Sequence, residues 1–77
     1  MSKQKYVRLK DYKEIIVFPD TIQHNEFKNW NPISAGFCYI EDNGTVKCFG
    51  ESVSLDLKSL PEDSEILRKQ LFDEKYY

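Results

Sequence analysis

The sequence predicts an α+β fold, a small antiparallel sheet in the order ββαββα with a C-terminal helix packed on the sheet. Three observations predict it: two short strand-like segments near the N-terminus, an Asn-Gly turn between apolar segments, and a capped amphipathic stretch at the end. The chain has 77 residues, which is the size of one small domain, so we expect residues 1–77 to fold as a single unit.

The first two strands are short and differ in pattern. Lys5 to Lys10 alternates, with Val7 and Leu9 on one side, which predicts a half-exposed strand. Glu14 to Phe18 reads EIIVF, and a short β-branched run of this kind favours a strand buried on both faces. Pro19 lacks the N–H group that a central strand needs and should end the strand.

A short helix and two further strands follow. Asp20 or Thr21 can cap a helix over Thr21 to Trp30, because their side-chain oxygens can accept a backbone hydrogen bond. Pro32 to Glu41 is the expected third strand, in which Gly36 marks a bulge or a close approach of another backbone. Thr45 to Gly50 is the expected fourth strand.

The third and fourth strands should form a hairpin, because Asn43-Gly44 between apolar segments is a strong hairpin signal. Two registers are open. A two-residue loop would place Ile40 opposite Lys47, whereas a three-residue loop with Gly44 in the left-handed conformation would place Ile40 opposite Val46. We favour the second, since it pairs residues of like kind. It also pairs Cys38 with Cys48, Phe37 with Phe49 and Tyr39 with Lys47.

The last helix carries the clearest start signal. Ser59 and Glu62 have the spacing of a capping box, and Pro61 suits the first turn. Acidic residues cluster at the start of the segment and basic residues follow, as the helix dipole favours. The apolar stripe that should face the sheet consists of Leu60, Leu67 and Leu71.

Composition excludes several classes of function. The net charge is -2, with both signs mixed along the chain, which argues against a surface for duplex nucleic acid. No apolar stretch is long enough to span a membrane and no signal peptide precedes the domain, so we expect a cytoplasmic protein. Two cysteines do not form a zinc motif, and we expect both to be reduced, with a cross-strand disulfide as the minority alternative.

No enzyme motif stands out, and we expect neither catalysis nor a cofactor nor a metal. His24 is the only histidine, and its polar neighbours Asn25 and Glu26 indicate a surface or capping residue. Glu62, together with the acidic residues that follow it, is accounted for by the helix dipole. Hydrolysis that uses His24 remains a minor alternative.

The stretch with ligand-binding character precedes the last helix. It places three hydroxyls and one ammonium group near a helix N-terminus, a combination suited to phosphate or carboxylate. The candidate ligand-binding residues are Ser52, Ser54, Lys58 and Ser59. The plainer alternative is that Ser59 only caps the helix and Lys58 is solvated. Glu51 and Asp56 in the same stretch oppose an anion.

A resemblance adds to this reading. The run PISAGFCYIEDNGTVKCFGESVSLDLKSLPEDSEIL, with IIVFPDTIQH upstream, resembles small uncharacterised proteins encoded by tailed phages, prophages and related mobile elements. It covers Ile15 to about Leu71, and the GESxSLxLKSxPED pattern carries most of it. Asp56 stands where that pattern has a glycine, and Leu60 where it has an arginine.

The resemblance implies a small accessory protein made in the cytoplasm of an infected host cell. Our first hypothesis is a non-enzymatic counter-defence protein that sequesters a phosphorylated small ligand, such as a nucleotide signal, at residues 52–59. The alternative is an inhibitor that binds a host defence protein through exposed aromatic and acidic residues. We also expect self-association into a homo-oligomer, since the mixed faces of the hairpin, with Trp30, Tyr76 and Tyr77, exceed what so small a chain can bury.

Overall fold

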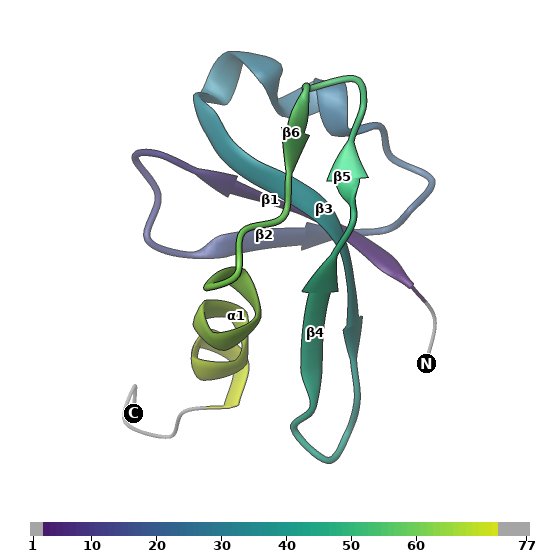
Figure 1. The fold of residues 1–77 in the computed structure, drawn as a ribbon, viewed down its shortest axis with the longest axis vertical. Coiled ribbons are helices and arrows are strands. Elements are labelled where there is room, and N and C mark those ends of the chain that lie inside the picture. The colour runs from purple at the N-terminus through teal and green to yellow at the C-terminus, as the bar shows by residue number, and fades with distance from the viewer. Residues whose placement is uncertain (1–2, 73–77) are drawn as a thin grey trace.

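The computed structural model describes residues 3–72 and has the expected α+β architecture, a four-stranded antiparallel sheet with a C-terminal helix packed on it (Figure 1). The spatial order of the strands is β2-β1-β3-β4, and a two-stranded sheet, β5-β6, stands apart. The elements are β1 (Gln4–Leu9), β2 (Ile15–Phe18), η1 (His24–Trp30), β3 (Pro32–Ile40), β4 (Val46–Phe49), β5 (Glu51–Ser52), β6 (Leu57–Lys58) and α1 (Asp63–Phe72).

The first strand is more buried than its pattern predicts. β1 lies between β2 and β3, and Tyr6, Val7 and Leu9 are all buried, so the prediction of a half-exposed strand was wrong. β2 forms an edge of the sheet, and both of its faces contact the core, as its apolar run predicts. Ile15 belongs to one apolar cluster, with Val17 packed against it, and Phe18 belongs to a second cluster, with Ile16 packed against it.

The hairpin adopts the three-residue loop. Ile40 pairs with Val46 and Cys38 with Cys48, and Gly44 has a φ of 92°, so the favoured register is confirmed. The Glu41 N–H donates to the Thr45 carbonyl at 2.9 Å and closes the loop. The left-handed conformation at Gly44 is the reason that this position favours glycine.

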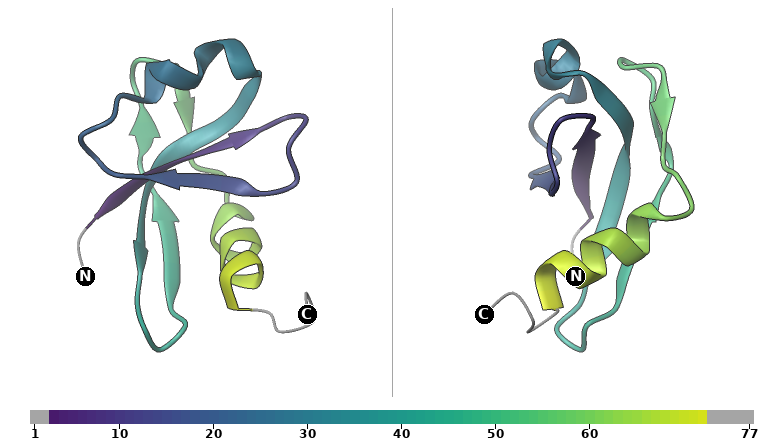
Figure 2. Two further views of the ribbon diagram at one scale, coloured as in Figure 1. Left: turned by 180° about the vertical axis from the view of Figure 1, so that it is seen from behind. Right: turned by 90° about the vertical axis from the view of Figure 1, so that its left-hand side faces the viewer.

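Gly36 marks a close approach between two parts of the backbone. A Cβ at this position would collide with the carbonyl oxygen of Phe49, so the chain leaving β4 passes directly over β3. Beyond this crossing β5 and β6 form their own small hairpin. The side view shows this hairpin and the β1-β2 pair on opposite sides of β3 (Figure 2).

The first helix differs from its prediction. It is a 3-10 helix that begins at His24, and no side chain caps it, so neither Asp20 nor Thr21 plays the expected role. It ends at Asn31, whose φ of 56° is left-handed and turns the chain into β3. The indifferent helix propensity of its asparagines is consistent with one short, tight element in place of a full α-helix.

The last helix has its capping contact one residue later than the sequence predicts. The Asp63 carboxylate accepts the Leu60 N–H at 2.9 Å, so the reaching-back half of the box is made by Asp63 in place of Glu62. Pro61 lies in the turn that leads into α1, which begins at Asp63. The Ser59 N–H donates to the Gly50 carbonyl at 2.9 Å and holds the end of the β5-β6 hairpin.

Two apolar clusters hold the layers together. Helix α1 packs Leu67, which is fully buried, onto the cluster of Tyr6, Ile15 and Cys38. The second cluster consists of Val7, Leu9, Phe18 and Ala35. Phe27 of η1 packs against it, as do Leu55 and Leu57 of the β5-β6 hairpin. No helix within residues 3–72 has the length and apolar character needed to cross a membrane.

Candidate functional site

The four candidate ligand-binding residues lie in and just after the β5-β6 hairpin, and the structure brings Ser52 and Ser54 together but separates Ser52 from Lys58. Ser52 is buried, accepts the Leu55 N–H at 3.3 Å and lies 3.4 Å from the Ser54 hydroxyl, so its hydroxyl serves the turn. Lys58 is exposed and lies opposite Glu51 in the ladder. Because neighbouring residues of a strand face opposite sides, Lys58 and Ser52 lie on opposite faces of the hairpin.

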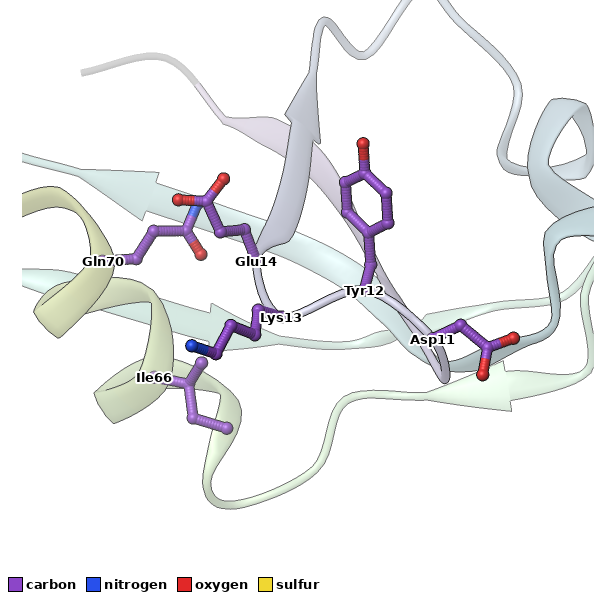
Figure 3. A pocket seen from close by; sticks show the side chains of 6 residues that line it. All are labelled: Asp11, Tyr12, Lys13, Glu14, Ile66 and Gln70. Carbon is purple, nitrogen blue, oxygen red and sulfur yellow. The ribbon is translucent and has the colours of Figure 1, made fainter.

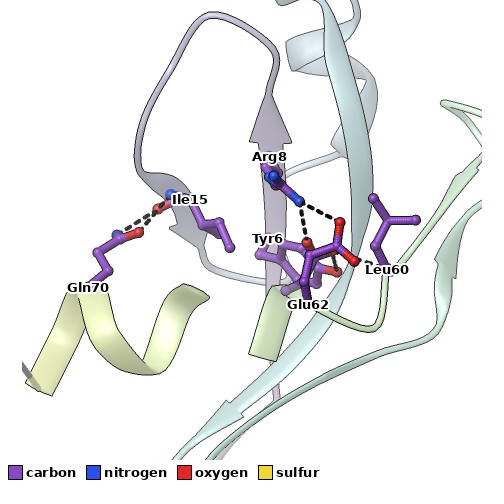
Figure 4. Close-up of polar contacts among 7 residues, drawn as sticks. Tyr6, Arg8, Ile15, Leu60, Glu62 and Gln70 are labelled. Carbon is purple, nitrogen blue, oxygen red and sulfur yellow. Dashed lines mark hydrogen bonds and ion pairs between the residues drawn. The ribbon is translucent and has the colours of Figure 1, made fainter. Parts of the chain in front are cut away.

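The helix N-terminus beside this hairpin holds an anionic group of the chain itself. The fully buried Asp63 carboxylate accepts the Tyr6 hydroxyl at 2.6 Å and the Leu60 N–H at 2.9 Å (Figure 4). Arg8 lies 3.1 Å from Asp63 and 3.3 Å from Glu62. Burial and the neighbouring Asp63 carboxylate raise the pKa of the Tyr6 hydroxyl, which therefore stays protonated and donates. The positive end of the helix dipole thus stabilises an internal carboxylate.

Asp56 adopts the left-handed backbone conformation in the turn of the β5-β6 hairpin, with a φ of 55°. Glycine adopts this conformation without strain, so Asp56 places a non-glycine residue at a position that favours glycine.

His24 has a structural setting. Its ring is buried against Phe18 and Phe37, and its Nε2 lies 2.9 Å from the Gly36 carbonyl, which fixes Nε2 as the donor. Burial lowers the pKa of the imidazole below its usual 6.5, so the ring is neutral at pH 7. The expectation of a surface or capping histidine was wrong, because two aromatic rings of the sheet enclose it.

The two cysteines are free thiols that face each other across the hairpin. Burial raises the pKa of Cys38 to about 11 and, with the neighbouring thiol and Asp63, that of Cys48 to about 12. Thiols with such pKa values are protonated at pH 7 and are poor nucleophiles or metal ligands. Among residues 3–72, no group of three or more His, Cys, Asp or Glu side chains could hold a metal ion.

The most exposed aromatic side chains gather around the loop between β1 and β2. Tyr12 is 56% exposed and Trp30 is 55% exposed, and both line one hollow. A second hollow lies on the other side of Tyr12, between the loop and α1 (Figure 3). We call these two hollows the loop surface, which is lined by Asp11, Tyr12, Lys13, Glu14, Trp30 and Gln70, among others.

The loop surface is held in place by hydrogen bonds at its base. The Lys10 N–H donates to the Asn31 carbonyl at 2.9 Å, and the Tyr12 N–H donates to the Leu9 carbonyl at 3.3 Å. The Asn31 amide also reaches the Asp11 carboxylate, at 3.5 Å. Tyr12 and Trp30 are therefore presented to solvent on anchored backbone, as aromatic anchors of interfaces are.

Known families give no further guide. Comparison with family models, curated proteins and solved structures finds no match to this chain.

The sequence indicates only part of the loop surface. Trp30 is an aromatic in excess of what the chain can bury, as are Tyr76 and Tyr77, which lie outside the described residues, but residues 11–13 have only the polar character of a turn. A tyrosine at a turn without glycine was the available signal, since turns favour small polar residues. Nothing in the sequence indicates that Gln70 closes the same surface from the far end of the chain.

Proposed function

We propose that this chain is a non-enzymatic binding protein that inhibits a partner protein by direct contact through the loop surface. The observation that carries the proposal is the pair of half-exposed aromatic side chains, Tyr12 and Trp30, around one hollow. Tryptophan and tyrosine dominate the binding energy of protein interfaces, and water exposure of such large rings is unfavourable without a partner.

The chemistry of the surface suits a protein partner better than a small anion. Asp11 and Glu14 are both exposed and acidic, and they flank Tyr12, with Lys13 between them. This combination of aromatic and acidic residues matches the inhibitor alternative drawn from the sequence. The resemblance to proteins of phages and mobile elements makes a host defence protein in the cytoplasm the proposed target.

The test compares alanine variants at Tyr12 and Trp30 with a control variant at Tyr39. In bacteria that carry defined anti-phage defence systems, we expect the wild type to restore phage plating against one system and to co-purify with one of its proteins. Tyr12→Ala and Trp30→Ala should each weaken that complex by roughly 30-fold, the scale of an interface hot spot of about 2 kcal/mol. Tyr39→Ala is the matched control, because Tyr39 is also exposed but lies on the β3-β4 hairpin.

Two results would contradict the proposal. One is a complex that forms equally well with Tyr12→Ala and Trp30→Ala. The other is a wild type that restores plating against none of the systems and binds none of their proteins.

Sequestration of a phosphorylated small ligand remains a second proposal. It rests on Lys58 and Ser54, whose side chains are both exposed in the β5-β6 hairpin. Calorimetry against a panel of nucleotides should show binding that Lys58→Glu abolishes, because a repulsive charge replaces an attractive one. A wild type that binds no nucleotide of the panel removes this proposal and leaves the first one untouched.

A further inference from the structure

The edge strand β2 is covered at one position by a side chain that imitates a neighbouring strand. The Ile15 N–H donates to Gln70 Oε1 at 2.7 Å, and Gln70 Nε2 donates to the Ile15 carbonyl at 2.9 Å (Figure 4). A primary amide offers one acceptor and a donor, as a peptide unit does. Gln70 therefore makes with Ile15 the pair of hydrogen bonds that an antiparallel strand would make.

The next outward position on the same edge is open. In an antiparallel ladder the backbone groups of successive residues point alternately toward and away from the partner strand. Since the groups of Ile15 point away from β1 and toward Gln70, those of Val17 also point outward. Within residues 3–72, no side chain and no backbone group from outside the sheet bonds to them.

The open edge borders the hollow between the β1-β2 loop and α1. Figure 3 shows Glu14 and Gln70 next to each other at the start of β2, with Lys13 extending toward Ile66. The lining of this hollow includes the Gln70 amide, the apolar Ile66 side chain and charges of both signs. The strand edge beside it carries outward backbone groups at Ile15 and Val17, which is the feature that the strand-addition mode of peptide binding uses.

We propose that an extended peptide segment of the partner adds to the sheet as a strand along β2, displacing the Gln70 amide from Ile15 and pairing with Val17. This inference rests on the proposed function, because it names the form in which the partner enters the same surface. A second copy of this chain fits the edge less well. Helix α1 lies beside β2 (Figure 1). A second copy that paired along this edge would bring its own α1 and its own β1-β2 loop to the same place, whereas a single strand would not.

The test uses a variant that removes one donor. Val17→Pro eliminates the outward N–H of Val17 without breaking the ladder to β1, since proline is tolerated where an edge strand faces solvent. The probe is an acetylated, amidated hexapeptide of alternating threonine and valine with two added N-terminal lysines. The readout is the amide NMR spectrum of the isotope-labelled chain, including the side-chain NH₂ signals of Gln70.

Saturable binding of the probe should shift the Gln70 and Val17 signals together. Val17→Pro should weaken binding by about tenfold, and Gln70→Ala should strengthen it by a similar factor, because the probe no longer competes with the amide. If Val17→Pro does not fold, the same probe with N-methylated backbone at alternate positions serves in its place, and the N-methylated probe should bind at least tenfold more weakly.

Four results would overturn the inference. One is binding that neither Val17→Pro nor N-methylation of the probe changes. Another is the absence of binding to both the wild type and Gln70→Ala at millimolar probe. The third is a dimer that Val17→Pro dissociates, without peptide binding, which would assign the edge to a second copy. A partner complex that is lost in Trp30→Ala but kept in Val17→Pro would also overturn strand addition, while leaving the proposed function standing.

Discussion

Replacement of Asp63 by alanine should remove the contact on which the first and last elements of the fold depend. The Asp63 side chain is fully buried, accepts from the Tyr6 hydroxyl and the Leu60 N–H, and pairs with Arg8. Asp63→Ala leaves the buried Tyr6 hydroxyl without its acceptor and the start of α1 without its cap. It also leaves Arg8, whose side chain is only 24% exposed, without its closest carboxylate.

The expected loss follows from these partners. Removing one member of a buried charged pair costs about 3–5 kcal/mol, and the uncapped helix start and the orphaned hydroxyl are part of that sum. A chain of 77 residues has a total stability of roughly 4–12 kcal/mol. Asp63→Ala should therefore remove a large part of the folding free energy or leave the chain unfolded.

Urea denaturation followed by circular dichroism measures this loss. With a slope of about 1 kcal/mol/M for so small a domain, the midpoint should fall by about 3 M or more. Glu62→Ala is the control, because Glu62 contacts the same arginine but its side chain is 54% exposed, and a pair of this kind contributes about 0–1 kcal/mol. Equal midpoints for the two variants would show that the Asp63 network does not hold the fold.

Three further predictions concern the core. Leu67→Ala should destabilise the chain by about 2–5 kcal/mol in the same urea experiment, through lost transfer energy and a cavity, and an unchanged midpoint would remove α1 from the core. Because burial lowers the pKa of folded His24 below 6.5, its contribution to stability is complete above about pH 6.5 and is lost as the pH falls toward the folded-state pKa. In His24→Gln the free energy of unfolding should lack this pH dependence. A pH profile of stability identical to that of the wild type would contradict the prediction. With pKa values of about 11 and about 12, Cys38 and Cys48 should react with iodoacetamide at pH 8 far more slowly in the native chain than in urea, and mass spectrometry of equal labelling in both would refute this.

The local signals of the sequence predicted the hairpin well and the strand environments poorly. The register of β3 and β4 follows from residues within twelve positions of one another, where turn chemistry and side-chain pairing agree. The position of β1 at the centre of the sheet depends on pairing with β3, some thirty residues later, which no local pattern encodes. For the same reason the pattern of β2 could not reveal that it lies at an edge.

The candidate site shows the same limit. The serine hydroxyls and the lysine were chosen for their spacing before a helix, but the two-stranded hairpin turns Ser52 inward and Lys58 outward. The acid that fills the helix start, Asp63, could be foreseen as a favourable charge but not as the acceptor for Tyr6. That partner lies 57 residues away in sequence and is brought there only by the completed sheet.

The long reach of these contacts bears on how the chain acquires its structure during synthesis. Tyr6 and Arg8 bind Asp63, and Ile15 binds Gln70, across separations of 55 to 57 residues. The side-chain contacts of β1 and β2 with α1 therefore form only after the last helix has been synthesised, and non-local closure of this kind slows folding. A chain cut short before Asp63 should leave the Tyr6 hydroxyl and Arg8 without their acceptor and should be more open to proteases.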